Sequence, residues 1–194
     1  MAALKQYLYV FLKYILPPLF TGGLGWYFKE LYDKRTRTRE LSILSRGLRA
    51  EVLEIKKAAL LKADNEYTVI DNHKKEVQNY TYAIINKQKP DEDCFTKYKD
   101  FKITTLPNNL DEIYKTKVDK LGEFDELLII RIKRYYETFR SWKDIHEALI
   151  NKYIFGLAQD YEAEALYNEC KQIAERVIKK SDELDAELAS KIKH

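Results

Sequence analysis

The chain has few of the residues that build tight turns, disulfide frameworks or metal sites. Only six of its 194 residues are Gly and four are Pro, which is few for a β-rich fold with many turns. Two cysteines, Cys94 and Cys170, exclude a disulfide-stapled scaffold and are too few for a zinc ribbon. The net charge of +3 excludes a nucleic-acid binder that works by bulk electrostatics. The abundant residues are Leu, Lys, Glu, Ala and Ile, which favour helices.

Most catalytic and cofactor signatures are missing as well. The only glycine cluster lies at residues 22–25 inside an apolar run, so no phosphate-binding loop is expected. No Gly-x-Ser-x-Gly elbow occurs, and no Cys stands beside a recognisable base. The three histidines, His73, His146 and His194, lie far apart and have no second ligand at metal spacing. The sequence therefore predicts no metal and no cofactor.

One long apolar run occupies residues 7–28, YLYVFLKYILPPLFTGGLGWYF, and contains a single charge. A helix of this length would reach about 33 Å, which matches the roughly 30 Å hydrocarbon core of a bilayer. Tyr and Trp residues at both ends resemble the aromatic belts of membrane spans. No small-residue cleavage site follows the run, so a signal peptide fits less well. A buried core helix is the other, less favoured alternative. We predict a transmembrane helix within residues 1–30.

The charges around this run predict its orientation. Only Lys5 precedes it, whereas seven basic residues against three acidic ones follow it up to residue 49: Lys29, Lys34, Arg35, Arg37, Arg39, Arg46 and Arg49 against Glu30, Asp33 and Glu40. Because Lys and Arg are retained on the cytoplasmic side of a membrane, residues 31–194 are predicted to form a cytoplasmic domain.

Six residues of the apolar run are unusual for a passive anchor: Lys13, Pro17, Pro18, Gly22, Gly23 and Gly25. A charge within a span usually faces a bundle interior or a watery cavity. Prolines remove backbone hydrogen bonds that neighbours must replace, and small residues let helices approach closely. Together these features favour self-association of the helix around water. The alternative is that Lys13 reaches the membrane surface and that the glycines are neutral.

The remaining sequence has the three- and four-residue hydrophobic spacing of amphipathic helices. The stripe Leu41, Leu44, Leu48, Val52, Ile55 and Ala59 predicts a helix that can continue from the span and that breaks at Asp64–Asn65. Further helices are predicted at about 72–87, from Asp91 to Phe101, at 110–122, at 123–153 and from Leu157 to Lys191, with a loop at 102–109. The predicted fold is an all-α bundle of four or five helices behind a single membrane helix.

One constellation carries possible chemistry. Arg140 is followed, after five residues, by His146 late in the long penultimate helix. This spacing resembles the Arg-x(4–6)-His motif of HEPN domains, which are all-α bundles. Many members of that family are ribonucleases, and two protomers usually contribute one motif each to a shared site. In that chemistry His exchanges a proton with a ribose hydroxyl and Arg stabilises phosphate charge. Six helical steps separate the two residues by about 120°, so alternatively Arg140 is a surface charge and His146 a satisfied, partly buried residue.

The whole architecture, with the divergent motif at Arg140 and His146, resembles the small membrane accessory proteins of type VI-B CRISPR systems. That resemblance implies a ring of protomers in the lipid bilayer of a bacterial inner membrane. It also implies a pore that enhances antiphage defence by an RNA-guided, RNA-cleaving effector. Catalytic activity is not expected, because polar partners are missing around the motif, which would then be an oligomerisation or regulatory pair. Direct binding of RNA stays open.

Two other functions compete with the pore. The first is a membrane-tethered HEPN ribonuclease that uses Arg140 and His146. The second is a non-catalytic scaffold whose bundle holds a cytoplasmic partner at the membrane.

Overall fold

A computed structural model describes residues 7, 11–89, 103–154 and 161–192 of the chain. These residues form helices, turns and coil, with no strand among them, so the all-α prediction is confirmed for this part of the chain. The elements, in order, are a π-helical turn (Phe11–Ile15), α2 (Leu16–Leu61), a second π-helical turn (Lys62–Tyr67), α3 (Thr68–Ile85), α5 (Glu112–Lys117), a 3₁₀ turn (Val118–Glu123), α6 (Glu126–Ile154) and α7 (Tyr161–Ile192).

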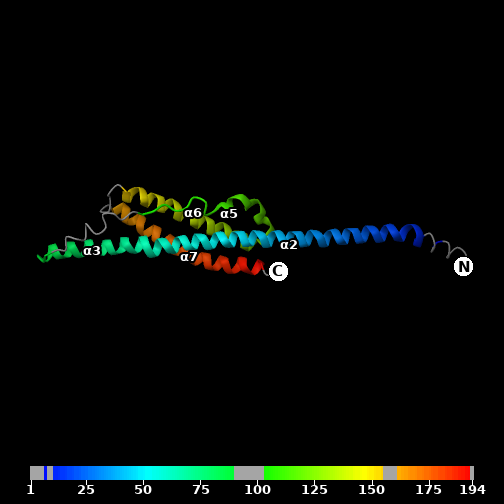
Figure 1. The fold of residues 1–194 in the computed structure, drawn as a ribbon, viewed down its shortest axis with the longest axis horizontal. Coiled ribbons are helices and arrows are strands. Elements are labelled where there is room, and N and C mark those ends of the chain that lie inside the picture. The colour runs from blue at the N-terminus through cyan, green and yellow to red at the C-terminus, as the bar shows by residue number, and fades with distance from the viewer. Residues whose placement is uncertain (1–6, 8–10, 90–102, 155–160, 193–194) are drawn as a thin grey trace.

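Helices α2 and α3 follow one another in a single rod, and the other helices pack against its middle (Figure 1). Helix α7 packs along both α2 and α6. It runs antiparallel to α2, since Arg49 pairs with Asp185 and Lys56, further along α2, pairs with Asp182. The amino-terminal half of α2 projects beyond this bundle, so α2 is both a bundle helix and an extension of it.

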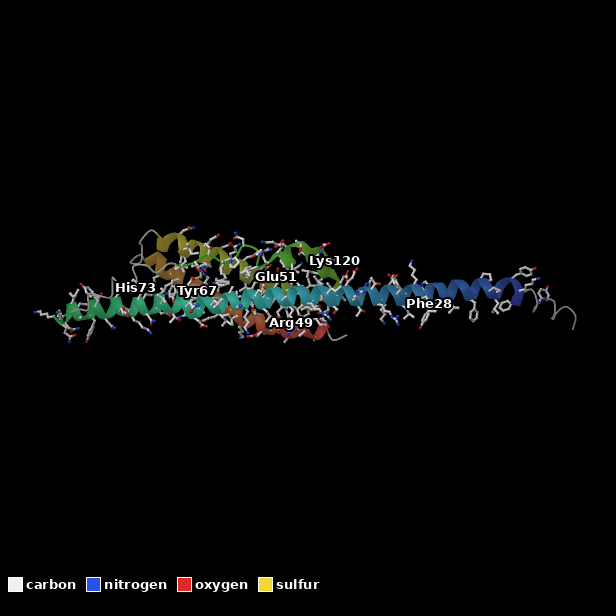
Figure 2. The ribbon with its side chains drawn as sticks, in the orientation of Figure 1. Phe28, Arg49, Glu51, Tyr67, His73 and Lys120 are labelled. Atoms are coloured by element: carbon white, nitrogen blue, oxygen red, sulfur yellow. The ribbon has the colours of Figure 1, made fainter. Side chains whose placement is uncertain are left out.

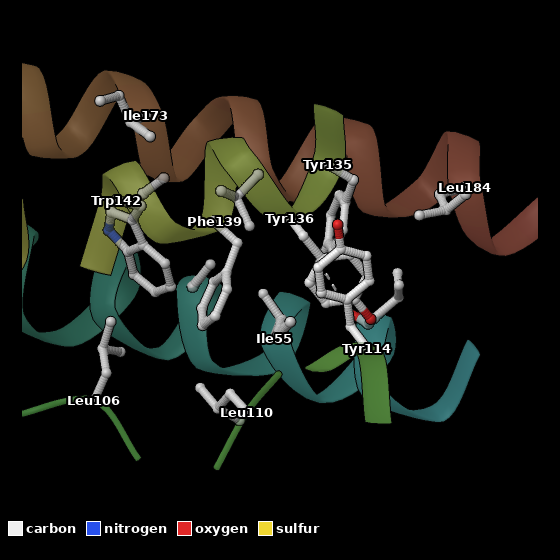
Figure 3. Packing of buried hydrophobic residues seen from close by; sticks show 14 of the residues in the cluster. Ile55, Leu106, Leu110, Tyr114, Tyr135, Tyr136, Phe139, Trp142, Ile173 and Leu184 are labelled. Atoms are coloured by element: carbon white, nitrogen blue, oxygen red, sulfur yellow. Dashed lines mark hydrogen bonds between the residues drawn. The ribbon is translucent and has the colours of Figure 1, made fainter. Parts of the chain in front are cut away.

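The core lies where α2, α6 and α7 meet. Leu48, Val52 and Ile55 of α2 are fully buried, as their spacing predicts. Figure 3 shows large rings of α6 reaching toward α2 around Ile55, and the buried rings are those of Tyr135, Tyr136, Phe139 and Trp142. Tyr114 of α5 stacks on one of them, Tyr136, with ring centroids 4.0 Å apart. Stacked and edge-to-face ring pairs each add about 0.5–1.5 kcal/mol beyond the burial of their area.

The predicted break at Asp64–Asn65 is wrong, because the chain continues there as the π-helical turn Lys62–Tyr67. A π-helical turn is wider than an α-helical one and changes the phase of the residues that follow it. The turn thereby places Lys62, Glu66 and Tyr67 in the bundle interior. The other predicted helices correspond to α3, α5 with the 3₁₀ turn, α6 and α7, whereas the predicted helix at 91–101 lies outside the described residues.

Not every predicted stripe is buried. Leu127 at the start of α6 is 61% exposed and Ile84 at the end of α3 is 52% exposed, although both were expected to face a core. Ile84 lies where α3 extends past the other helices (Figure 1), whereas Leu127 lies on the outer face of α6, next to Leu128, which is buried. The hydrophobic spacing correctly predicts a helix at both positions. Within the described residues, however, no second helix covers either side chain.

The predicted transmembrane helix is wrong. Among the described residues, no helix contains a stretch that is both long enough and apolar enough to cross a bilayer. The apolar residues are diluted by two prolines, three glycines and several Tyr and Trp side chains, and charges resume at Lys29 and Glu30. The prediction of a single-pass inner-membrane protein depended on this span and is wrong for the same reason. Helix α2 passes through residue 30 without a break, so the predicted domain boundary lies inside a helix.

Candidate functional site

The structure separates the two residues of the HEPN-like motif. Arg140 lies on the outer side of α6 with its side chain 48% exposed, and its Nε lies 3.5 Å from a carboxylate oxygen of Asp111. Its guanidinium also covers the ring of Tyr114 at 5.4 Å from the centroid. His146, by contrast, is 1% exposed. The 120° separation expected for six helical steps is thus maintained, and within one chain the two side chains do not form one site.

His146 belongs to a buried hydrogen-bond network centred on Tyr67. Its Nε2–H donates to the backbone carbonyl of Thr104 over 2.9 Å, which makes Nδ1 the acceptor of the neutral ring. The Tyr67 hydroxyl then donates to this Nδ1 over 3.2 Å. The same hydroxyl oxygen accepts the indole N–H of Trp142 over 3.1 Å and lies 3.0 Å from the thiol sulfur of Cys170. One hydroxyl therefore satisfies three buried side chains from two helices.

Burial sets the protonation states of this network. Desolvation lowers the pKa of His146 below its ordinary value, despite the hydrogen bond from Nε2 to Thr104, because the imidazolium would lose its hydration. Burial also raises the pKa of Cys170 to about 11 and raises the pKa of Tyr67. A neutral imidazole, a neutral thiol and a neutral phenol result. Since both ring nitrogens of His146 are occupied and the ring is buried, this arrangement stabilises the bundle and presents no base to a substrate.

A buried ion pair adjoins the network. Lys62 Nζ donates to Glu66 Oε1 over 2.7 Å and to the carbonyl oxygen of Thr104 over 2.5 Å. The hydroxyl of Thr104 donates to the same carboxylate oxygen over 2.6 Å, and its backbone N–H does so over 3.2 Å. Glu66 Oε2 has no hydrogen-bond partner among the described residues. These contacts attach the segment at residues 103–106, which has no regular secondary structure, to the π-helical turn of the rod.

Glu51 makes a second buried connection that the sequence pattern does not reveal. It is 4% exposed, and its carboxylate accepts the backbone N–H groups of Ile113 over 2.6 Å and Tyr114 over 3.1 Å. The hydroxyl of Tyr136 donates to it as well. Asp111, which precedes α5, makes no capping hydrogen bond of its own, so Glu51 caps α5 from a different helix. Burial raises the pKa of Glu51 against these hydrogen bonds.

Glu51, Glu66 and Tyr67 were missed because each looks like an ordinary residue of a helix. Apart from Lys62, which stands four residues before Glu66, their partners lie between 38 and 103 residues away in sequence. A local signal exists only for Glu51, which stands within the apolar stripe beside Val52. No three His, Cys, Asp or Glu side chains of the described ranges are placed together as a metal site would require.

The remaining predicted site residues lie on the projecting part of the rod, which we call the arm and define as residues 14–40. None of its described side chains is buried. Pro17 and Pro18 occupy the first turn of α2, where missing N–H groups are tolerated, directly after the first π-helical turn. A Cβ added to Gly22, Gly23 or Gly25 would meet no atom within 4 Å. Lys13, just before the arm, lies over the ring of Tyr14 at 5.4 Å.

The arm carries most of its apolar surface in contact with solvent. Seven large apolar side chains on it are between 45% and 70% exposed: Tyr14, Phe20, Leu24, Trp26, Tyr27, Phe28 and Tyr32. Figure 2 shows Phe28 on the projecting helix, whereas Glu51 and Tyr67 lie where the other helices pack. Monomeric proteins rarely expose contiguous apolar patches above a few hundred Å², and larger ones mark interaction sites. The arm is therefore the strongest candidate for a binding surface.

Comparisons with family models, with curated proteins and with solved structures found no match to this chain. The resemblance to type VI-B accessory proteins, and the antiphage function that it implies, stay predictions.

Proposed function

We propose that this protein is a non-enzymatic scaffold that self-associates through its arm, with a second copy of the chain as the partner. The observation that carries the proposal is the arm itself, a helix with an exposed apolar surface that the bundle holds away from its own core. A helix that is apolar around most of its circumference is normally buried. The placement of His146 inside the core and of Arg140 outside it supports a role without catalysis.

The spacing of the exposed residues favours a helical partner. Phe20, Leu24, Tyr27 and Leu31 follow at steps of four, three and four, which is the spacing of a coiled-coil seam. Phe20 and Tyr27 precede Leu41 and Leu48 by 21 residues each, or three heptads. The seam that packs inside the bundle thus continues onto the arm in the same register. There it has no covering helix within the described chain.

Charge determines the direction in which two arms pair. The segment from Lys29 to Arg46 carries six basic and three acidic residues. Parallel pairing would place the two basic segments beside each other, which is unfavourable. Antiparallel pairing about Leu24 brings Phe20 of one copy near Phe28 of the other and keeps the basic segments apart. Three aromatic side chains from each copy would bury roughly 900–1,500 Å² in total. This range includes the area of about 1,200 Å² at which stable protein interfaces begin.

The mass of the purified full-length protein in solution, measured by light scattering, tests this proposal. We expect a dimer or larger assembly that Phe20→Glu with Tyr27→Glu converts to a monomer. The matched control is Trp26→Glu with Tyr32→Glu, which removes two exposed aromatics of the same arm but away from the seam. This control should keep the mass of the wild type.

Three outcomes would contradict the proposal. A wild-type monomer at micromolar concentration would show that the arm does not pair. If both double variants dissociate the assembly to the same extent, the arms associate through exposed aromatic surface in general and not through the seam. A monomer that co-sediments with phospholipid vesicles would assign the arm to a lipid surface in place of a second copy. Circular dichroism of each variant establishes that the helices are retained.

A further inference from the structure

Helices α2 and α7 are joined by a row of ion pairs along one flank. Lys56 Nζ lies 2.5 Å from a carboxylate oxygen of Asp182. Arg49 makes a two-point contact with Asp185, with Nε at 2.6 Å from one oxygen and a terminal nitrogen at 3.4 Å from the other. The two cations are seven residues apart, so they occupy the same position in successive heptads of α2. In this protein, then, α2 receives an acidic helix along a basic flank.

The basic flank continues on α2 past the end of α7. Arg35 stands 14 residues, or two heptads, before Arg49, and Arg39 and Arg46 lie on the neighbouring turns. Together with Lys34 they border an open groove of about 820 Å³ that begins at Ile192, in the last turn of α7. Its other lining residues are Leu31, Thr38, Ser42 and Ile43. The groove therefore occupies the position that α7 would fill if it extended along the arm.

Among the residues that the structure describes, no carboxylate lines this groove. Within the described part of the chain, Lys34, Arg35, Arg39 and Arg46 form no ion pair. Like charges one turn apart on a helix, as in Arg35 and Arg39, are mildly destabilising. On another flank of the arm the charges are mixed, because Glu30 and Asp33 lie beside the basic residues Lys29 and Arg37.

We propose that an acidic, amphipathic helix of a partner protein docks in this groove, in line with α7 and antiparallel to α2. Its carboxylates would pair with Arg35, Arg39 and Arg46 as Asp182 and Asp185 pair with Lys56 and Arg49. Its apolar face would cover Leu31, Ile43 and Ile192, of which Ile43 is 60% exposed. This apolar floor favours a helix over a nucleic acid, whose phosphate backbone needs cations alone. The groove shares Leu31 with the seam of the arm, but none of the seam's aromatic side chains is among its lining residues.

The probe is a fluorescent synthetic helix of about 20 residues, about 30 Å long, with Leu along one face and Glu along both flanks of it. Its binding to the full-length protein is measured by fluorescence anisotropy. Arg35→Glu with Arg39→Glu should weaken the affinity at least about tenfold, which corresponds to about 1.4 kcal/mol. The control Lys29→Glu with Arg37→Glu makes the same change in charge outside the groove and should change the affinity less than about twofold. Ile43→Asp, an exposed position, should weaken binding as the arginine pair does.

The outcomes that overturn the proposal are distinct. Absence of binding by the acidic helix would reject the groove as a docking site. An equal loss in the control pair would show attraction by overall charge alone. Tighter binding of a single-stranded DNA oligonucleotide, lost with the same arginines, would assign the groove to nucleic acid. The mass of the particle, measured beside the affinity, shows whether self-association of the arm is unchanged in these variants.

Discussion

Replacement of Glu51 by Ala should strongly lower the free energy of unfolding, although the sequence pattern does not show that this residue is buried. Glu51 is buried, and its carboxylate accepts the N–H groups of Ile113 and Tyr114 and the hydroxyl of Tyr136. Alanine would leave three donors unsatisfied: two backbone N–H groups at the start of α5 and the Tyr136 hydroxyl of α6. Each buried donor that loses its partner costs about 1–3 kcal/mol. Part of this cost is offset, because the carboxylate no longer has to be held in a site whose burial raises its pKa.

A net loss of about 3 kcal/mol in the free energy of unfolding follows from these terms. For a chain of this size, that loss lowers the melting temperature by roughly 6–12 °C. Glu51→Gln keeps the shape and one acceptor oxygen but turns an amide N–H₂ toward a donor, so we expect about half the effect of Ala. Thermal and urea unfolding, followed by circular dichroism, measure both changes.

Glu54→Ala is the matched control, since Glu54 lies one turn further along α2 with its side chain exposed. It should change the stability by less than about 0.5 kcal/mol. If Glu51→Ala and Glu54→Ala unfold at the same urea concentration, the carboxylate does not cap α5 and the reasoning from burial fails.

Three further changes test the core and the motif. Tyr67→Phe leaves Trp142, His146 and Cys170 without their shared hydroxyl, and a loss of about 2–3 kcal/mol is expected in urea unfolding; a loss below about 0.5 kcal/mol would refute the network. Because the pKa of His146 is lowered by folding, the unfolded chain binds more protons, so the His146 part of the stability is complete above about pH 6.5 and is lost as the pH falls through the folded pKa. His146→Gln should remove this part of the pH slope, and an unchanged slope between pH 7 and 5 would contradict it. Arg140→Ala should cost less than about 1 kcal/mol in thermal unfolding, because the side chain is half exposed and Asp111 keeps Lys115 as a partner at 2.7 Å.

The bundle helices could be predicted because their periodicity is local. Leu48, Val52 and Ile55 repeat at helical spacing, and the structure buries all three. Leu127 and Ile84 fit the same pattern but are exposed, because the period of a helix reveals neither the width of its covered face nor how far its neighbours extend. The apolar run was read as a membrane span from its length, although its prolines, glycines and aromatic rings make it too weakly apolar.

The polar interior could not be predicted from the sequence. Lys62, Glu66 and Asp64 together suggest a solvated helix end, yet a π-helical turn directs two of them inward. Their stabilising partner, Thr104, is about 40 residues away in a segment without regular structure. The Arg140–His146 spacing was visible, but only the packing of α6 determines that one residue is buried and the other is not.

The antiparallel contact between α2 and α7 has a consequence for how the chain is made. The two helices lie near opposite ends of the sequence, and the paired residues Arg49 and Asp185 are 136 positions apart. At about 5–20 residues per second, a ribosome needs roughly 7–27 s to pass from one to the other. During that time the face of α2 that carries Leu48 and Val52 has no α7 to cover it, and a nascent chain would expose it to any chaperone or sister chain nearby. Completion of the contact therefore depends on α7, the later of these two helices to be synthesised.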